Sequence, residues 1–205
     1  MTQADILRWR RFGDAGVLLE FDDGIEATRW CRAVEASNID AQARPGWRSA
    51  LITSTMSTAS LIEALRSLVL DDAPTAPVRH LNIEVVYDGE DLDDVAASTG
   101  MSREAVVARH TGALYTVVCL GFSRAFPYLA GLDRSLWLPR RSTPRVRVPA
   151  GSVAIAAEQT GIYPQASPGG WHLLGRTDAV LFDERCEPPS LLQPGDQVRF
   201  MTVRA

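Results

Sequence analysis

The sequence predicts an α+β protein of two parts: a small lobe with helices packed on a mostly antiparallel sheet, and a larger β-barrel domain. In the first seventy residues, segments with helical apolar spacing alternate with short apolar strands. Beyond residue 121, short strands alternate with Gly/Pro turns instead. The stretch DDAPTAP fits neither pattern, so we predict domains at residues 1–77 and 78–205.

The first part is expected to run strand, strand, helix, strand, helix. RWRRF and GVLLEF are predicted strands joined by a turn at Gly13-Asp14, and SALIT is the third strand. Apolar residues at helical spacing follow the first pair of strands and again follow SALIT. The candidate N-caps are Asp23 for the first helix and either Ser57 or Thr58 for the second.

The second part begins with a predicted strand, LNIEVVY, and two short helices, DLDDVAAS and SREAVVARH. Ser102 is the expected N-cap of the second helix, which should end near Gly112. LYTVVCL reads as a buried strand. The strands predicted after it are RVRVP, SVAIA, WHLLG, AVLF and QVRFMTV. Many short strands at this spacing favour a closed or nearly closed barrel.

The composition excludes several kinds of chemistry. All 21 residues of the Lys+Arg class are arginine, so this chain has no P-loop lysine, Schiff-base lysine or biotinylated lysine. Three scattered cysteines and three dispersed histidines suggest neither a disulfide framework nor a metal site. The net charge of −4 gives no reason to expect nucleic acid or a membrane as partner. No signal-peptide pattern or long apolar run is present, so we expect a cytoplasmic protein.

Positive charge is nevertheless concentrated in one stretch. Residues 101–149 contain eight arginines and two acidic residues, a local surplus of +6 in an acidic chain. Turn formation alone accounts for each isolated glycine of this region, but not for the arginines. Because the guanidinium fork suits carboxylates and phosphates, the surplus predicts a site for a small anion.

Three blocks of the second part occur together in the order GFSRAFPYL, PRRSTPRVRVPAGSV and QTGIYPQASPGGWHLLGRT. They resemble the family of the 5-oxoprolinase B subunit (PxpB) and allophanate hydrolase subunit 1, which also includes the sporulation-kinase inhibitor KipI. The resemblance extends from about Ile83 to Thr177. The family commonly has Pro-Gly in the first block where this chain has Arg124-Ala125, a departure expected to alter the loop conformation.

The resemblance implies a ferredoxin-like first lobe and a cyclophilin-like barrel. It also implies a partner, the second allophanate-hydrolase-type subunit or C subunit, joined in some systems by an A subunit. The implied activity is an ATP-dependent opening of 5-oxo-L-proline to L-glutamate, with ATP bound on the partner or at the interface. The alternatives are a subunit that hydrolyses allophanate or another urea amide, and a non-enzymatic regulator similar to the kinase inhibitor.

Three ionisable residues of the second part are candidates for the site: Arg145, Arg140 and His110. Strand alternation places Arg145 and Arg147 on one face of RVRV and both valines on the other. Arg145 either clamps a carboxylate inside the barrel or points outward into solvent, and Arg140 is a weaker candidate of the same kind. His110, which matches a characteristic histidine of the family, either transfers protons or complements the end of its helix.

Other candidates are polar or aromatic residues near glycine turns. Each could contact a small cyclic amide, or could simply complete a turn or the core. These candidates are Gln159, Thr160, Tyr163, Ser167, Gly169, Trp171 and Tyr128. Tyr128 belongs to the apolar cluster FPYL, which we expect in a loop, as core or as a partner-docking surface. Ser152 lies in no nucleophile motif and is expected to be structural.

Overall fold

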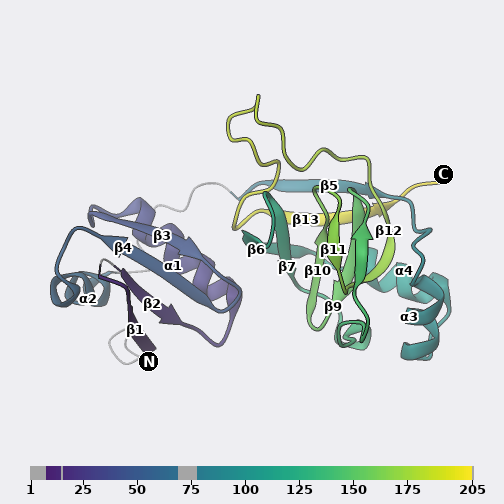
Figure 1. The fold of residues 1–205 in the computed structure, drawn as a ribbon, viewed down its shortest axis with the longest axis horizontal. Coiled ribbons are helices and arrows are strands. Elements are labelled where there is room, and N and C mark those ends of the chain that lie inside the picture. The colour runs from purple at the N-terminus through teal and green to yellow at the C-terminus, as the bar shows by residue number, and fades with distance from the viewer. Residues whose placement is uncertain (1–7, 15, 69–77, 205) are drawn as a thin grey trace. The chain divides into compact units, whose positions relative to one another are not determined.

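The computed structural model describes residues 8–14, 16–68 and 78–204. The chain divides into two units, Met1–Val78 and Arg79–Ala205 (Figure 1). The predicted linker DDAPTAP lies outside the described residues, so its role as a linker stays a prediction. In the described part, no helix is long and apolar enough to cross a bilayer.

In its described residues the first unit is a four-stranded antiparallel sheet in the order β1-β2-β4-β3, with two helices. Its elements are β1 (Arg8–Phe12), β2 (Gly16–Glu20), α1 (Gly24–Ala36), β3 (Ala41–Pro45), β4 (Ser49–Ser54) and α2 (Thr58–Ser67). Both predicted helix starts are confirmed. Asp23 accepts a hydrogen bond from the Ile25 amide at 2.7 Å, and Ser57, rather than Thr58, accepts one from the Ser60 amide at 3.1 Å.

The second unit is built on a seven-stranded sheet in the order β12-β9-β10-β7-β6-β13-β5. Its strands are β5 (His80–Val85), β6 (Tyr115–Gly121), β7 (Phe126–Ala130), β9 (Ser152–Ala156), β10 (Gln159–Ile162), β12 (His172–Arg176) and β13 (Gln197–Thr202). Two further strands, β8 (Arg145–Val148) and β11 (Ser167–Gly169), form a separate antiparallel pair. The other elements are α3 (Leu92–Thr99), α4 (Arg103–Gly112) and a 3-10 turn at Arg134–Leu136.

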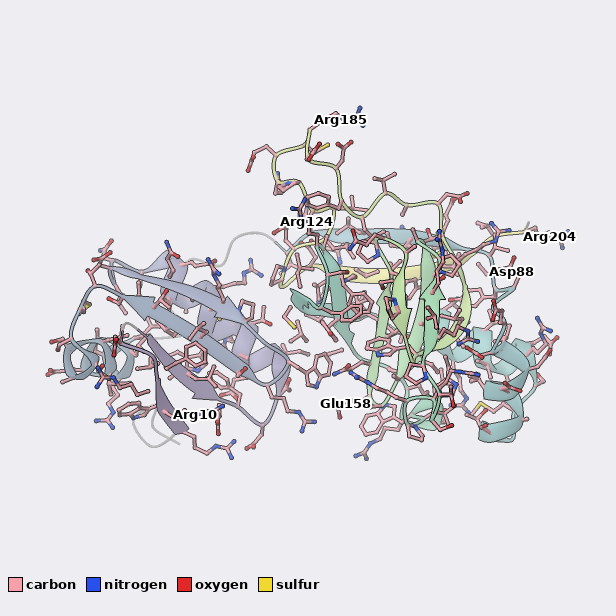
Figure 2. All side chains as sticks on the ribbon, viewed as in Figure 1. Arg10, Asp88, Arg124, Glu158, Arg185 and Arg204 are labelled. Atoms are coloured by element: carbon pink, nitrogen blue, oxygen red, sulfur yellow. The ribbon has the colours of Figure 1, made fainter. Side chains whose placement is uncertain are left out.

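The two edge strands of the large sheet approach each other and nearly close a barrel. Val86, directly after β5, and Arg176, at the end of β12, exchange two backbone hydrogen bonds of 2.9 Å. The Arg176 side chain also donates to Asp88 at 3.0 Å, and Asp88 is labelled in Figure 2. Within the sheet β5 and β13 pair in parallel, whereas the other neighbours are antiparallel. The predicted α+β class with a nearly closed barrel is therefore confirmed.

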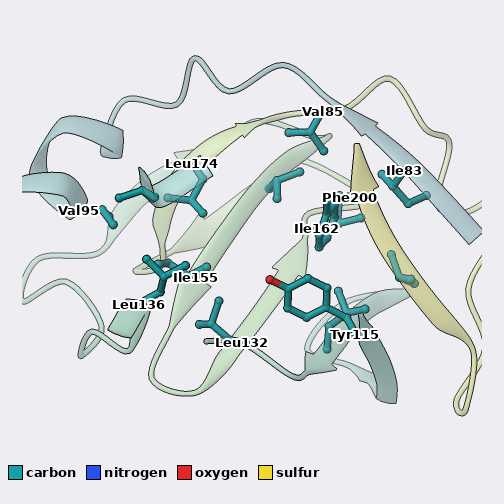
Figure 3. Packing of buried hydrophobic residues seen from close by; sticks show 14 of the residues in the cluster. Ile83, Val85, Val95, Tyr115, Leu132, Leu136, Ile155, Ile162, Leu174 and Phe200 are labelled. Carbon is teal, nitrogen blue, oxygen red and sulfur yellow. The ribbon is translucent and has the colours of Figure 1, made fainter. Parts of the chain in front are cut away.

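The inside of this barrel is a packed apolar core. Figure 3 shows Tyr115, Ile155, Ile162 and Phe200 converging there, and all four side chains are fully buried. Helix α4 packs against β13, and α3 packs against β12. The core therefore occupies the place where a ligand cavity inside the barrel would have to lie.

A loop prediction and a strand prediction in the second unit, and one omission in the first, are corrected by the structure. FPYL is not a loop but part of the interior strand β7, which pairs with both β6 and β10. AVLF forms only one isolated bridge, Phe182 with Ser190, because Pro188 and Pro189 beside it lack the N–H donors that a ladder needs. Strand β3 escapes prediction, since AQARP buries only Ala43 and shows no apolar alternation.

The chain departs from the family pattern in the turn before β7. The Phe126 amide donates to the Ser123 carbonyl at 3.2 Å, and Ala125 adopts a φ of +58°. A type II turn has a positive φ at its third position and favours Pro-Gly at its second and third positions. The hydrogen bond and the positive φ of Ala125 are the features that favour Pro-Gly, and here an alanine is held in the left-handed conformation.

We expect Ala125→Gly to raise the free energy of unfolding by about 0.5–1 kcal/mol. Left-handed alanine costs about 1–2 kcal/mol, and the greater backbone freedom of glycine in the unfolded chain offsets part of that gain. Urea unfolding followed by tryptophan fluorescence measures the change. Ala150→Gly is the matched control, because Ala150 is an exposed turn residue without positive φ and should lose stability. If the Ala125→Gly variant were no more stable than the parent, the left-handed conformation of Ala125 would not be strained.

Candidate functional site

Six of the eight arginines in the stretch 101–149 have a partner within the chain. Arg103 donates to Asp93 at 3.0 Å and Arg109 to Asp133 at 3.2 Å. Arg141 and Arg145 both bind Asp91. Arg124 and Arg134 lie over the rings of Phe182 and Trp137, at 5.8 and 5.2 Å from the ring centroids. Of the eight, only Arg140 and Arg147 have neither an ion pair nor a ring contact within the described part of the chain.

Asp91 is the centre of this network, and sequence reasoning does not single it out. Its carboxylate is 2% exposed and accepts hydrogen bonds from Arg145 Nη2 at 2.7 Å, from the Leu173 amide at 2.7 Å and from Arg141. Burial alone would raise the pKa of Asp91, but the hydrogen bonds and the positive charges outweigh burial and lower that pKa. The pKa of Arg145 is raised by its hydrogen bond to Asp91. Asp91 therefore remains ionised and fixes both arginines.

Arg145 thus holds a carboxylate, but one that belongs to the same chain. It also donates to Glu90 at 3.2 Å. The predicted strand alternation is wrong here, because Val148 is buried whereas Val146 is 89% exposed. The pairing of Gly169 with Arg145 and of Ser167 with Val148 leaves an extra residue in β8, and this bulge breaks the two-residue periodicity.

Four of the predicted residues come together in an aromatic cluster beside β8 and β11. Tyr163 and Trp171 are 2% and 5% exposed, and Tyr128 lies half-buried beside them. Gly169 is required there, since a Cβ at this position would lie 2.2 Å from the Tyr163 hydroxyl oxygen. Burial raises the pKa of Tyr163, against a hydrogen bond from the Trp171 backbone and the charges of Arg140 and Arg145. Arg140 and Arg145 therefore lie close enough to Tyr163 for their positive charges to lower its pKa.

The other predicted residues lie apart or show no ligand geometry. Ser167 Oγ is buried and has no hydrogen-bond partner among the residues that the structure describes. Gln159 opens β10 and is partly exposed, and none of the hydrogen bonds described involves its side chain. Thr160 is fully buried in the core with His110.

His110 is enclosed by the barrel core. Its Nδ1 lies 2.7 Å from the Tyr87 hydroxyl, and its Nε2 lies 2.9 Å from Thr160 Oγ1, which in turn lies 3.0 Å from the Ala154 carbonyl oxygen. Because that carbonyl can only accept, Thr160 donates to it and accepts from Nε2–H, so Tyr87 donates to Nδ1. Burial lowers the pKa of His110 to about 3. His110 is therefore neutral near pH 7 and does not contact the carbonyls at its helix end.

An open groove of about 600 Å³ lies between α3 and residues 138–143. Arg140 is the one predicted residue that lines it. Other lining residues are Asp94, Ala97, Ser98, Ser142 and Thr143. The sequence signal for Asp91 and Asp94 is the acidic run DGEDLDD, which by itself predicts only the start of a helix. A second open cavity of about 620 Å³, along β5, β13 and residues 176–179, contains none of the predicted residues.

Comparison with known proteins places the chain in a family. The model of the carboxyltransferase domain, subdomain C and D, matches residues 7–192. The B subunit of the 5-oxoprolinase of Haemophilus influenzae is 51% identical over 126 residues, which are 60% of this chain and 59% of that protein. The chain thus matches little more than half the length of this relative.

Solved structures agree with the family match. The protein TTHA0988 superposes with a TM-score of 0.79 at 41% identity, covering 93% of this chain and 40% of that one. The conserved uncharacterized protein PH0987 from Pyrococcus horikoshii gives a TM-score of 0.60 at 32% identity and covers 96% and 97% of the two chains. With a family match over most of its length, the chain belongs to the family described as carboxyltransferase domain, subdomain C and D, which confirms the predicted relationship to the B subunit of 5-oxoprolinase.

Proposed function

We propose that this chain is the B subunit of a cytoplasmic, ATP-dependent 5-oxoprolinase that converts 5-oxo-L-proline to L-glutamate. The observation that carries the proposal is the 51% identity to the 5-oxoprolinase B subunit of Haemophilus influenzae. The match covers 59% of that relative. The activity of the whole 5-oxoprolinase is therefore proposed for this chain and does not follow from the match alone. The partners would be the C subunit and, in the complete enzyme, the A subunit.

The reaction breaks the lactam C–N bond. Water supplies the oxygen of the new carboxylate, and the ring nitrogen takes up protons to become the amine of glutamate. Amide resonance makes direct attack by water slow, and activation of the carbonyl oxygen, for instance by phosphorylation with ATP, would lower that barrier. The task left for this chain is to bind and orient a small anion, which Arg140 can do since its guanidinium has no ion-pair partner within the described residues.

The groove of this chain does not suit the triphosphate of ATP. A triphosphate needs several cations, whereas Arg141 and Arg145 are already bound to Asp91, and Asp94 adds a negative charge to the groove. We therefore place ATP on the partner or at the interface with it.

For His110 we propose a positioning role in place of direct proton transfer. Its side chain has no exposed surface, and both ring nitrogens are engaged by Tyr87 and Thr160. Through Thr160 it holds β10, the strand between β7 and β9 beneath the aromatic cluster.

Co-expression with the C and A subunits, followed by an assay for glutamate release, tests the proposed function. We expect glutamate and ADP to form from 5-oxo-L-proline only when ATP and all three chains are present. Allophanate serves as the competing substrate in the same assay. Ammonia release from allophanate without any glutamate would instead support the amide hydrolase alternative. If the C and A subunits were active without this chain, this chain would not be a required subunit of the enzyme.

A further inference from the structure

We infer that the groove between α3 and residues 138–143 binds a small molecule through two groups at once, a carboxylate on Arg140 and an N–H donor on Asp94. Lactam acids and α-amino acids belong to this class. Naming 5-oxo-L-proline as the ligand rests on the proposed function, whereas the class itself rests on the groove.

Among the described residues that line the groove, Arg140 is the one cation without an ion pair. Arg140 is exposed and makes no ion pair with any described residue, whereas its neighbour Arg141 is bound to Asp91. The hydroxyl groups of Ser142 and Thr143 line the same wall. A guanidinium with hydroxyl groups beside it can bind one carboxylate through charge-assisted hydrogen bonds.

The opposite wall carries the negative charge. Asp94, Ala97 and Ser98 lie on one face of α3, because residues three and four positions apart are neighbours on a helix. The Asp94 side chain is 73% exposed, and its contact with Arg141 is 3.9 Å long, beyond hydrogen-bond distance. Its carboxylate therefore keeps its capacity to accept from a ligand N–H, and it would repel a ligand with a second negative charge.

The wall that carries Arg140 is held rigid by its backbone. The Leu138 carbonyl accepts from the Ala157 amide at 2.6 Å, and the Arg141 amide donates to the Gly170 carbonyl at 2.8 Å. Between them, the Pro139 carbonyl accepts from His172 Nε2 at 2.9 Å. These contacts fix the backbone on both sides of Arg140 and leave its side chain free. Such a preformed wall loses little conformational freedom when a ligand binds.

Isothermal titration of the co-purified complex with three ligands tests the inference. 5-Oxo-L-proline carries both groups, 2-pyrrolidinone lacks the carboxylate, and tetrahydro-2-furoic acid lacks the N–H. We expect each analogue to bind the parent complex at least about ten-fold more weakly than 5-oxo-L-proline, because each leaves one charged partner without its hydrogen bond.

Matched variants assign each loss to a residue. Arg140→Gln should weaken 5-oxo-L-proline about ten-fold or more and leave 2-pyrrolidinone unchanged. Asp94→Asn should reduce the preference for 5-oxo-L-proline over tetrahydro-2-furoic acid. Arg147→Gln is the control, since Arg147 is also exposed and without an ion pair in the described structure but does not line the groove.

The outcomes separate this inference from the proposed function. A complex that converts 5-oxo-L-proline, and whose Arg140→Gln and Asp94→Asn forms bind it as Arg147→Gln does, overturns the inference and leaves the function standing. A complex without turnover, in which the two groove variants selectively lose 5-oxo-L-proline, supports the groove as a binding site and overturns the proposed activity.

Discussion

Asp91→Ala is expected to lower the free energy of unfolding by about 3–5 kcal/mol, the cost of removing one partner of a buried ion pair. The substitution leaves Arg141 and Arg145 without their shared carboxylate and leaves the buried Leu173 amide without an acceptor. It therefore loosens the attachment of β8 and of the segment that carries Arg140. Thermal and urea unfolding of the purified chain measure the loss.

Asp93→Ala is the control for this prediction. Asp93 is also on α3 and binds Arg103, but its side chain is 72% exposed, so we expect a loss below about 1 kcal/mol. Equal losses of stability for the two variants would show that the buried Asp91 network stabilises the fold no more than an exposed ion pair does. Asp91→Asn should fall between them, because the amide oxygen can still accept from one donor.

His110 should make the protein sensitive to acid. The folded chain keeps His110 neutral down to a pKa of about 3, whereas in the unfolded chain a histidine takes up a proton below about pH 6.5. The unfolded state therefore binds more protons between these values, and the contribution of His110 to stability is complete above about pH 6.5. As the pH falls below 6.5, the free energy of unfolding should decrease by about 1 kcal/mol per pH unit from this residue alone.

Comparison with His110→Gln isolates that contribution from the acidic residues. At pH 7 the parent should be the more stable protein, because glutamine does not reproduce both the hydrogen bonds and the stacking on Phe200 at 4.6 Å. The difference between the two proteins should narrow as the pH is lowered towards 4. His80→Gln, at an exposed position, serves as the control. If the difference in stability stayed constant across this range, the folded chain would protonate His110 as readily as the unfolded chain does. That result would contradict the lowered pKa of His110.

The elements that sequence reasoning predicts well depend on neighbours along the chain. The caps at Asp23, Ser57 and Ser102 each bond an amide two or three residues later, so the local sequence contains the whole interaction. Strand β7 is mistaken for a loop because its stability comes from β6 and β10, which lie on either side of it only after folding. Its proline and the preceding turn dominate the local pattern.

The site is harder to predict, for the same physical reason. The surplus of +6 is counted over residues 101–149, whereas the acids that neutralise Arg141 and Arg145 precede that window, at Glu90 and Asp91. Counting charge along a chain does not show which charges meet in space. Residue chemistry near the glycine turns identifies Arg140 and the members of the aromatic cluster as candidates, but only the folded structure shows that Arg145 is occupied and that Asp94 lines the groove.

The parallel pairing of β5 with β13 has a consequence for the order in which the protein is made. A ribosome produces the first strand of the second unit at His80 and its last at Gln197–Thr202, yet these two strands are immediate neighbours. Until the last strand emerges, the nascent domain exposes one side of β5 and the apolar surface that Phe200 later covers. Chaperone binding to ribosome-held chains should therefore persist until residues 197–202 have left the ribosome and can pair with β5.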